Sequence, residues 1–113
     1  MQKSENIAMP LNDYPDNKGK IRKLVSIDGN RSTFFVEDEI VRPQGPKPHR
    51  KLIYLQRLKH SDRELEYRFA YYMRGVKGRT KDRWVFGQYA LMIPAKDLSW
   101  LLNEARKKNW KGF

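Results

Sequence analysis

Residues 50–92 read RKLIYLQRLKHSDRELEYRFAYYMRGVKGRTKDRWVFGQYALM, and this stretch decides the fold. Over residues 64–74 apolar and polar side chains alternate, and this period of two predicts a half-buried strand. Neighbouring strands are predicted over residues 51–60 and 83–92, because both are rich in apolar and aromatic residues and border on turn-forming residues. The stretch therefore predicts three successive strands of an antiparallel sheet.

The alternating strand has two different faces. Tyr67 and Phe69 belong to its regular apolar face, and the simplest interpretation is that this face packs in the core. The opposite face carries Arg68, Tyr72 and Arg74, so basic side chains and an aromatic ring lie side by side there. Such a sheet is able to bury one face and to offer the other to a phosphate-bearing polymer.

The N-terminal part of the chain adds a hairpin and an arm. Residues 20–36 predict a hairpin around the turn Asp28-Gly29-Asn30, because type I′ turns favour Asp-Gly. Residues 42–48 hold three prolines, which cannot donate to a ladder, and predict a connector. Residues 1–19 show no periodicity and predict a flexible arm ahead of a single domain, 20–113.

The C-terminal part predicts one amphipathic helix over residues 94–109. Leu98, Leu101, Leu102 and Ala105 fall at i, i+3, i+4 and i+7, which forms one apolar stripe. The expected fold is α+β: a twisted antiparallel sheet of four to five strands, with this helix packed on one face.

The net charge of +11 is distributed unevenly. Residues 1–46 hold seven bases and seven acids, so residues 47–113 account for the whole of it. A surface that binds a polyanion explains this concentration, whereas a charge that only keeps the protein soluble has no reason to concentrate. The simpler alternative is a solvated basic surface.

A basic loop and the strands beside it supply the candidate binding residues. The loop 75–83 combines two glycines with four bases, which suits close approach to phosphate, although a solvated hairpin loop explains its glycines equally well. The candidates for phosphate binding are Arg57, Lys59, Arg68, Arg74, Lys77, Arg79, Lys81 and Arg83. The candidates for base stacking are Tyr72, Trp84 and Phe86, with one of the last two expected to be exposed. The functional face is expected to join Arg57 and Lys59 with Arg68, Tyr72 and Arg74, opposite the helix.

Few residues suggest catalysis. Cysteine is absent, which excludes disulfides and thiolate metal ligands, and His49 and His60 are the only histidines. Glu64 and Glu66 are more simply explained by cross-strand ion pairs than by a metal. We therefore expect no metal, no cofactor and no enzymatic activity, while a metal-independent, toxin-like ribonuclease stays open because such sites leave little trace in a sequence.

The order of elements resembles a known fold. The meander, the basic sequence Gly78-Arg79-Thr80-Lys81, the end of the last strand at Ile93-Pro94 and the helix with Trp100-Leu101 look like the single-stranded DNA-binding transcriptional positive-coactivator fold. The Whirly and Pur proteins share that general plan of sheet plus helix. The resemblance covers about residues 50–110 and implies a homodimer that pairs through its helices, with single strands lying across the sheet.

These observations favour non-catalytic binding of single-stranded nucleic acid, with DNA preferred over RNA. Besides the ribonuclease, a second alternative is a protein-interaction adaptor whose basic face meets an acidic partner. No run of residues approaches the length needed to cross a bilayer, so a cytoplasmic protein without a membrane partner is expected.

Overall fold

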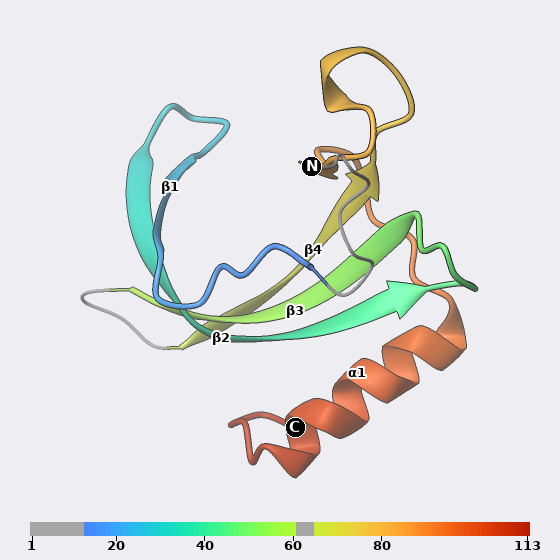
Figure 1. Ribbon diagram of the computed structural model, residues 1–113. Coiled ribbons are helices and arrows are strands. Elements are labelled where there is room, and N and C mark those ends of the chain that lie inside the picture. The colour runs from blue at the N-terminus through green and yellow to red at the C-terminus, as the bar shows by residue number, and fades with distance from the viewer. Residues whose placement is uncertain (1–12, 61–64) are drawn as a thin grey trace.

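The computed structural model describes residues 13–60 and 65–113. Five strands form one antiparallel sheet in the order of the sequence, and a helix follows them (Figure 1). The elements are β1 (Ile21–Val25), β2 (Arg31–Gln44), β3 (Lys51–Lys59), β4 (Glu66–Arg74), the short 3-10 helix η1 (Gly78–Thr80), β5 (Trp84–Phe86) and α1 (Ala95–Lys107). The predicted α+β fold is confirmed.

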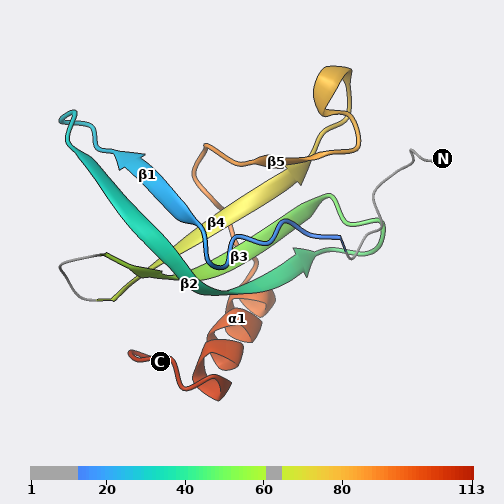
Figure 2. The same ribbon diagram turned by 60° about the vertical axis from the view of Figure 1, so that its left-hand side comes forward.

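The sheet is curled, so it has a concave and a convex face, and α1 lies along the convex face (Figures 1 and 2). Ile40, Ile53 and Leu55 of the sheet pack there against Leu101 and Ala105 of α1. Both helix residues belong to the predicted apolar stripe. The main core is therefore the layer between this sheet face and the helix, where burial of apolar surface stabilises the fold.

An ion pair joins the start of α1 to β2. Arg42 Nε donates to Asp97 Oδ1 over 2.9 Å, and the Asp97 side chain is buried. The Arg42 guanidinium carbon also lies 4.9 Å from the ring centroid of Trp100. Asp97 is in the first turn of α1, where the helix dipole favours a carboxylate. These contacts fix the helix N-terminus relative to the sheet.

A segment that precedes β1 lies against the concave face (Figure 2). Asn17 is buried there, and its backbone N–H donates to Glu39 Oε2 over 2.8 Å. The Tyr54 hydroxyl donates to the carbonyl oxygen of Pro15 over 2.6 Å. Most of the predicted arm, residues 1–12, lies outside the described residues, and the rest of it packs on the sheet.

The first hairpin is present, but β2 is longer than the sequence suggested. The backbone N–H of Ser26 donates to the carbonyl of Asn30 over 2.8 Å, but between them only Gly29 has a positive φ, so the turn is not the expected type I′. The predicted connector 42–48 is wrong in its first part, because β2 continues through Pro43 to Gln44. β1 pairs with β2 only as far as Phe35, so β2 is an edge strand at Pro43, where a missing N–H costs no ladder bond.

The predicted strand 83–92 is mostly wrong, since β5 ends at Phe86. Gly87 passes directly over the side chain of Tyr71, and a Cβ at Gly87 would lie 2.1 Å from the Tyr71 ring. The Tyr71 hydroxyl accepts a bond from the backbone N–H of Tyr89 over 3.0 Å. The backbone N–H of Gly87 also donates to the Tyr71 carbonyl over 2.7 Å, so the chain is still bonded to β4 one residue beyond β5.

Candidate nucleic-acid interface

The strand register divides the predicted binding residues between the two faces of the sheet. Arg57 lies opposite Tyr67, and Arg68 lies opposite Gln56. Residues directly opposite one another in an antiparallel pair share a face, and neighbours along a strand alternate. The expectation that Arg57 and Lys59 share a face with Arg68 is therefore wrong, because both lie on the convex side with Tyr67.

Contacts on the convex side occupy Arg57. Its Nε donates to Glu37 Oε1 over 2.7 Å, and its guanidinium carbon lies 5.9 Å from the ring centroid of Trp110. Lys59 is exposed at the end of β3. These two residues cannot act together with the concave face on one short strand of nucleic acid.

Arg68 lies near the middle of the concave face, between two aromatic rings. Its guanidinium carbon is 4.7 Å from the ring centroid of Phe34 and 5.5 Å from that of Phe86. Its Nε donates to Gln56 Oε1 over 2.7 Å. Burial lowers the pKa of Arg68 from its ordinary value, but a guanidinium remains charged at neutral pH. The result is an oriented positive charge between two rings.

The three predicted stacking residues share the concave face, because Tyr72 pairs with Phe86 and Arg74 pairs with Trp84. Tyr72 is half-buried and meets the ring of Phe86 edge-on at 5.4 Å. Trp84 is half-buried and meets Tyr14 edge-on at 6.2 Å. Phe86 is 42% exposed, so it is the ring that an incoming base would reach first.

A buried polar network orients Arg68 through its bond to Gln56. Gln56 Nε2 donates to Glu39 Oε1 over 2.8 Å, while Gln56 Oε1 accepts the bond from Arg68. Asn17 Oδ1 accepts bonds from the Arg22 guanidinium and from the Tyr72 hydroxyl, each over 3.2 Å. Sequence reasoning missed Asn17, Glu39 and Gln56, because no local pattern links residues that meet only through the sheet register.

The basic loop closes on itself beyond the end of β4. The backbone N–H of Gly75 donates to the carbonyl of Arg83 over 2.8 Å, and Arg74 pairs with Asp82 over 3.0 Å. A Cβ at Gly75 would lie 1.9 Å from the carbonyl oxygen of Thr80, so this position requires glycine. The exposed bases of the loop are Lys77, Arg79, Lys81 and Arg83. The loop that carries them lies beside the concave face rather than across it (Figure 2).

Comparison with known proteins adds no family. No family model, curated protein or solved structure matches this chain. The resemblance to the coactivator fold, the homodimer and the cytoplasmic location therefore stay predictions. In the described part of the chain, no helix is long and apolar enough to cross a membrane, and no three potential metal ligands come together.

Proposed function

We propose that this protein binds single-stranded nucleic acid, without catalysis, on the concave face of its sheet and along the loop 75–83. The observation that carries the proposal is the position of Arg68, whose guanidinium lies between Phe34 and an exposed Phe86. A positive charge between rings suits a polymer that alternates phosphates with flat bases.

Charge and rings are continuous from the sheet to the loop. Phe86 is at the end of β5, and Arg83 immediately precedes that strand. A strand of nucleic acid that stacks one nucleobase on Phe86 is thus able to place one neighbouring phosphate beside Arg68. The next phosphate on the other side then lies beside the lysines and arginines of the loop. The phosphate contacts then supply most of the affinity, and the contact with the Phe86 ring orients the nucleic-acid strand.

The rings also argue for a single strand rather than a duplex. A base must leave its stack before it lies on a protein ring, and in a duplex that step costs pairing and stacking energy. Of the two single-stranded polymers, we propose DNA as the preferred one, with RNA as the alternative.

Fluorescence anisotropy with labelled oligonucleotides tests the proposal. A single strand should bind with an affinity that falls steeply with salt, more tightly than its duplex at equal length, and binding should quench tryptophan fluorescence. Salt-independent or undetectable binding would contradict the proposal.

The same samples separate the alternatives. On a denaturing gel, RNA and DNA strands should remain intact with and without EDTA. Cleavage of the RNA both with and without EDTA would reveal a metal-independent ribonuclease. Protein that purifies free of nucleic acid and binds no strand would favour the adaptor.

A further inference from the structure

β1 is an edge strand, since within the described residues it pairs with β2 alone. The backbone N–H of Ser26 donates to Asn30, and the backbone N–H of Val36 donates to Lys20, over 2.8 and 3.0 Å. These bonds flank the β1–β2 ladder. Because bonded pairs recur at every second residue of an antiparallel ladder, the even-numbered residues of β1 direct their backbone groups toward β2.

The odd-numbered residues of β1 consequently direct their backbone groups away from the sheet. They are Ile21, Lys23 and Val25, and all three side chains are exposed. Ile21 is 68% exposed and Val25 is 63% exposed. A row of unpaired N–H and C=O groups with exposed apolar side chains is a template for an added strand.

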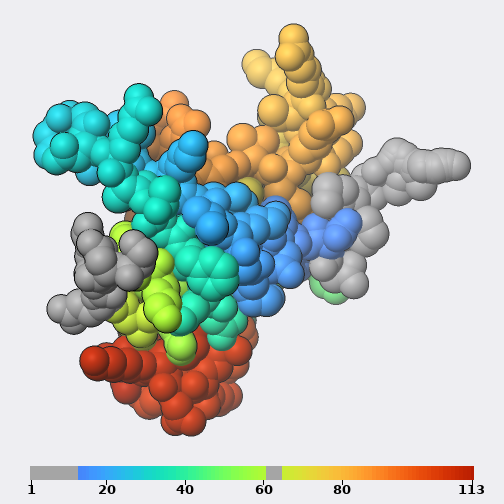
Figure 3. Space-filling model, turned by 90° about the vertical axis from the view of Figure 1, so that its left-hand side faces the viewer, coloured from blue at the N-terminus to red at the C-terminus, as the bar shows by residue number. Residues whose placement is uncertain are grey.

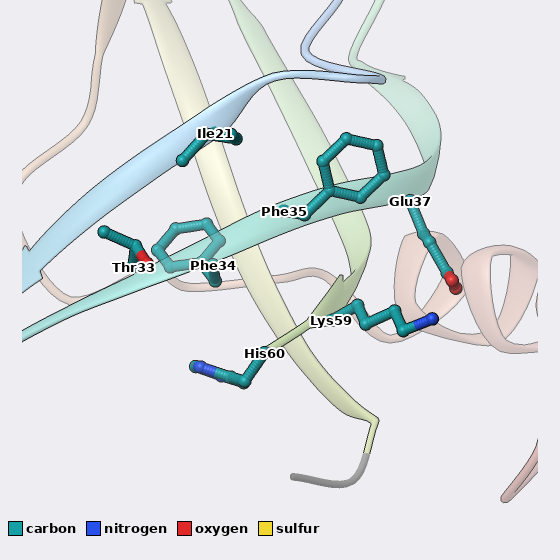
Figure 4. A pocket seen from close by; sticks show the side chains of 7 residues that line it. All are labelled: Ile21, Thr33, Phe34, Phe35, Glu37, Lys59 and His60. Atoms are coloured by element: carbon teal, nitrogen blue, oxygen red, sulfur yellow. The ribbon is translucent and has the colours of Figure 1, made fainter. Parts of the chain in front are cut away.

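Two hollows adjoin this strand on the hairpin, which projects from the body of the protein (Figure 3). The first has a volume of about 330 Å³ and is lined by Ile21, Thr33 and Phe35, among others (Figure 4). The second, of about 340 Å³, is lined by Val25, Arg31 and also Thr33. Ile21 and Val25 are four residues apart, which is about 13 Å along a strand and matches side chains i and i+4 of an extended partner.

The charge of the hairpin identifies the kind of partner. Residues 20–31 contain four bases and a single acid, Asp28. A second copy of this chain, paired antiparallel about Lys23, would bring two lysines directly opposite each other, and like charges at such positions are destabilising. Acidic side chains at the same positions would form cross-strand ion pairs instead.

We propose that β1 binds an extended acidic peptide of a partner protein, which adds to the sheet as a sixth strand. In antiparallel alignment the peptide places apolar residues opposite Val25 and Ile21 and acids opposite Lys23 and Arg22. From its N-terminus to its C-terminus, the five-residue segment of the peptide that faces Val25 to Ile21 is then apolar, neutral, acidic, acidic and apolar. Main-chain bonds supply affinity, and the two hollows and the charges supply specificity. The outward backbone edge of β1 includes neither Arg68 and Phe86 nor the loop 75–83, so the proposal does not depend on nucleic-acid binding.

A labelled ten-residue peptide with the core VTEEI tests the proposal on the full chain. Binding should slow amide hydrogen exchange at Ile21, Lys23 and Val25, which attraction between charges alone does not do. The variant Ile21→Pro removes one outward N–H without changing the charge, and it should weaken binding about tenfold. Lys23→Glu should reverse the preference, so that a VTKKI peptide binds more tightly than VTEEI.

Two controls keep the result interpretable. Lys96→Glu makes the same change of charge on α1 and should leave peptide affinity unchanged. If Ile21→Pro unfolds the hairpin, two measurements still test the proposal. They are the hydrogen exchange of the unmodified protein with the peptide and the reversed peptide preference of Lys23→Glu. Protection of the three amides by an oligonucleotide but not by the peptide would overturn the proposal in favour of nucleic acid. Concentration-dependent protection without any peptide would overturn it in favour of a second copy, and no protection at all would refute it.

Discussion

Asn17 and Glu39 make a two-point contact between the segment that precedes β1 and the concave face of the sheet. The Asn17 backbone N–H donates to Glu39 Oε2 over 2.8 Å, and its side-chain Nδ2 donates to Oε1 over 3.3 Å. Glu39 also accepts from Gln56, which in turn orients Arg68. One buried carboxylate thus connects the N-terminal segment with the positive charge at the centre of the proposed interface.

Replacing Asn17→Ala should lower the free energy of unfolding by about 1 to 3 kcal/mol, because buried partners lose their hydrogen bonds. Urea unfolding measures this loss. Asn103→Ala is the matched control, since Asn103 is exposed on α1, and it should cost less than about 0.5 kcal/mol. Equal losses for the two variants would show that the hydrogen bonds of the Asn17 side chain add nothing to stability, while the backbone bond to Glu39 is kept in both.

Replacing Phe86→Ala should weaken binding of a single-stranded oligonucleotide by about 1 to 3 kcal/mol, the contribution of one stacked base. The dependence of affinity on salt should not change, because no phosphate contact is lost. Val85→Ala is the control: Val85 is the neighbour of Phe86 in β5 and is similarly exposed, but on the other face. If both variants bind alike, no base stacks on Phe86.

Arg79 and Lys59 offer a test of the division between the faces. Arg79→Gln should reduce the slope of log affinity against log salt by about 0.7, as expected when a single strand loses one phosphate contact. Lys59→Gln removes the same charge on the convex side and should leave the slope unchanged. A reduced slope in the Lys59 variant would mean that nucleic acid also reaches the convex side.

The elements that the sequence predicts well are those governed by local patterns. The strand within residues 64–74, the hairpin around Asp28-Gly29 and the leucine stripe of the helix each recur in the structure, because a period or a turn requires only neighbouring residues. The expected burial of the apolar face of β4 recurs only in part, since Phe69 is 39% exposed. The exposure of Phe86 rather than Trp84 was left open by the sequence, since it depends on Tyr14, which lies against Trp84.

The errors have long-range causes. The sequence gives no relative register for β3 and β4, so it could not show that Arg57 and Arg68 lie on opposite faces. The alternation after Trp84 continues to Met92 in the sequence, yet β5 ends at Phe86, and Gly87 lies against Tyr71, 16 residues earlier in the chain. Glycine inside a strand pattern indicated a close approach but not its partner.

Replacing Gly87→Ala should therefore destabilise the protein. The added Cβ would lie 2.1 Å from the Tyr71 ring, which is buried and fixed by its bond to Tyr89. Overpacking of this kind costs about 1 to 3 kcal/mol, measurable by urea unfolding. Gly112→Ala is the control for a site with no atom within 4 Å, where only the positive φ is strained. A smaller loss at Gly87 than at Gly112 would contradict the close contact with Tyr71.

Tyr54 should make stability fall in alkaline solution. Burial raises the pKa of its hydroxyl above the ordinary value of 10.0. The unfolded chain therefore releases this proton from about pH 10 upward while the folded protein retains it, so the contribution is complete below pH 10 and declines above it. The decline is at most about 1.4 kcal/mol per pH unit for one proton.

Tyr54→Phe separates this effect from the other tyrosines. The variant should lose about 1 kcal/mol at pH 7, because the bond to the Pro15 carbonyl is gone, and its stability should fall less steeply above pH 10. Urea unfolding from pH 7 to 11 gives both quantities. Tyr89→Phe, at an 87% exposed position, should match the unmodified protein throughout.

Burial also raises the pKa of Tyr14, so part of the alkaline decline should remain in the Tyr54→Phe protein. An unchanged decline would show that the Tyr54 hydroxyl ionises as readily in the folded protein as in the unfolded chain, and that Pro15 does not cover it.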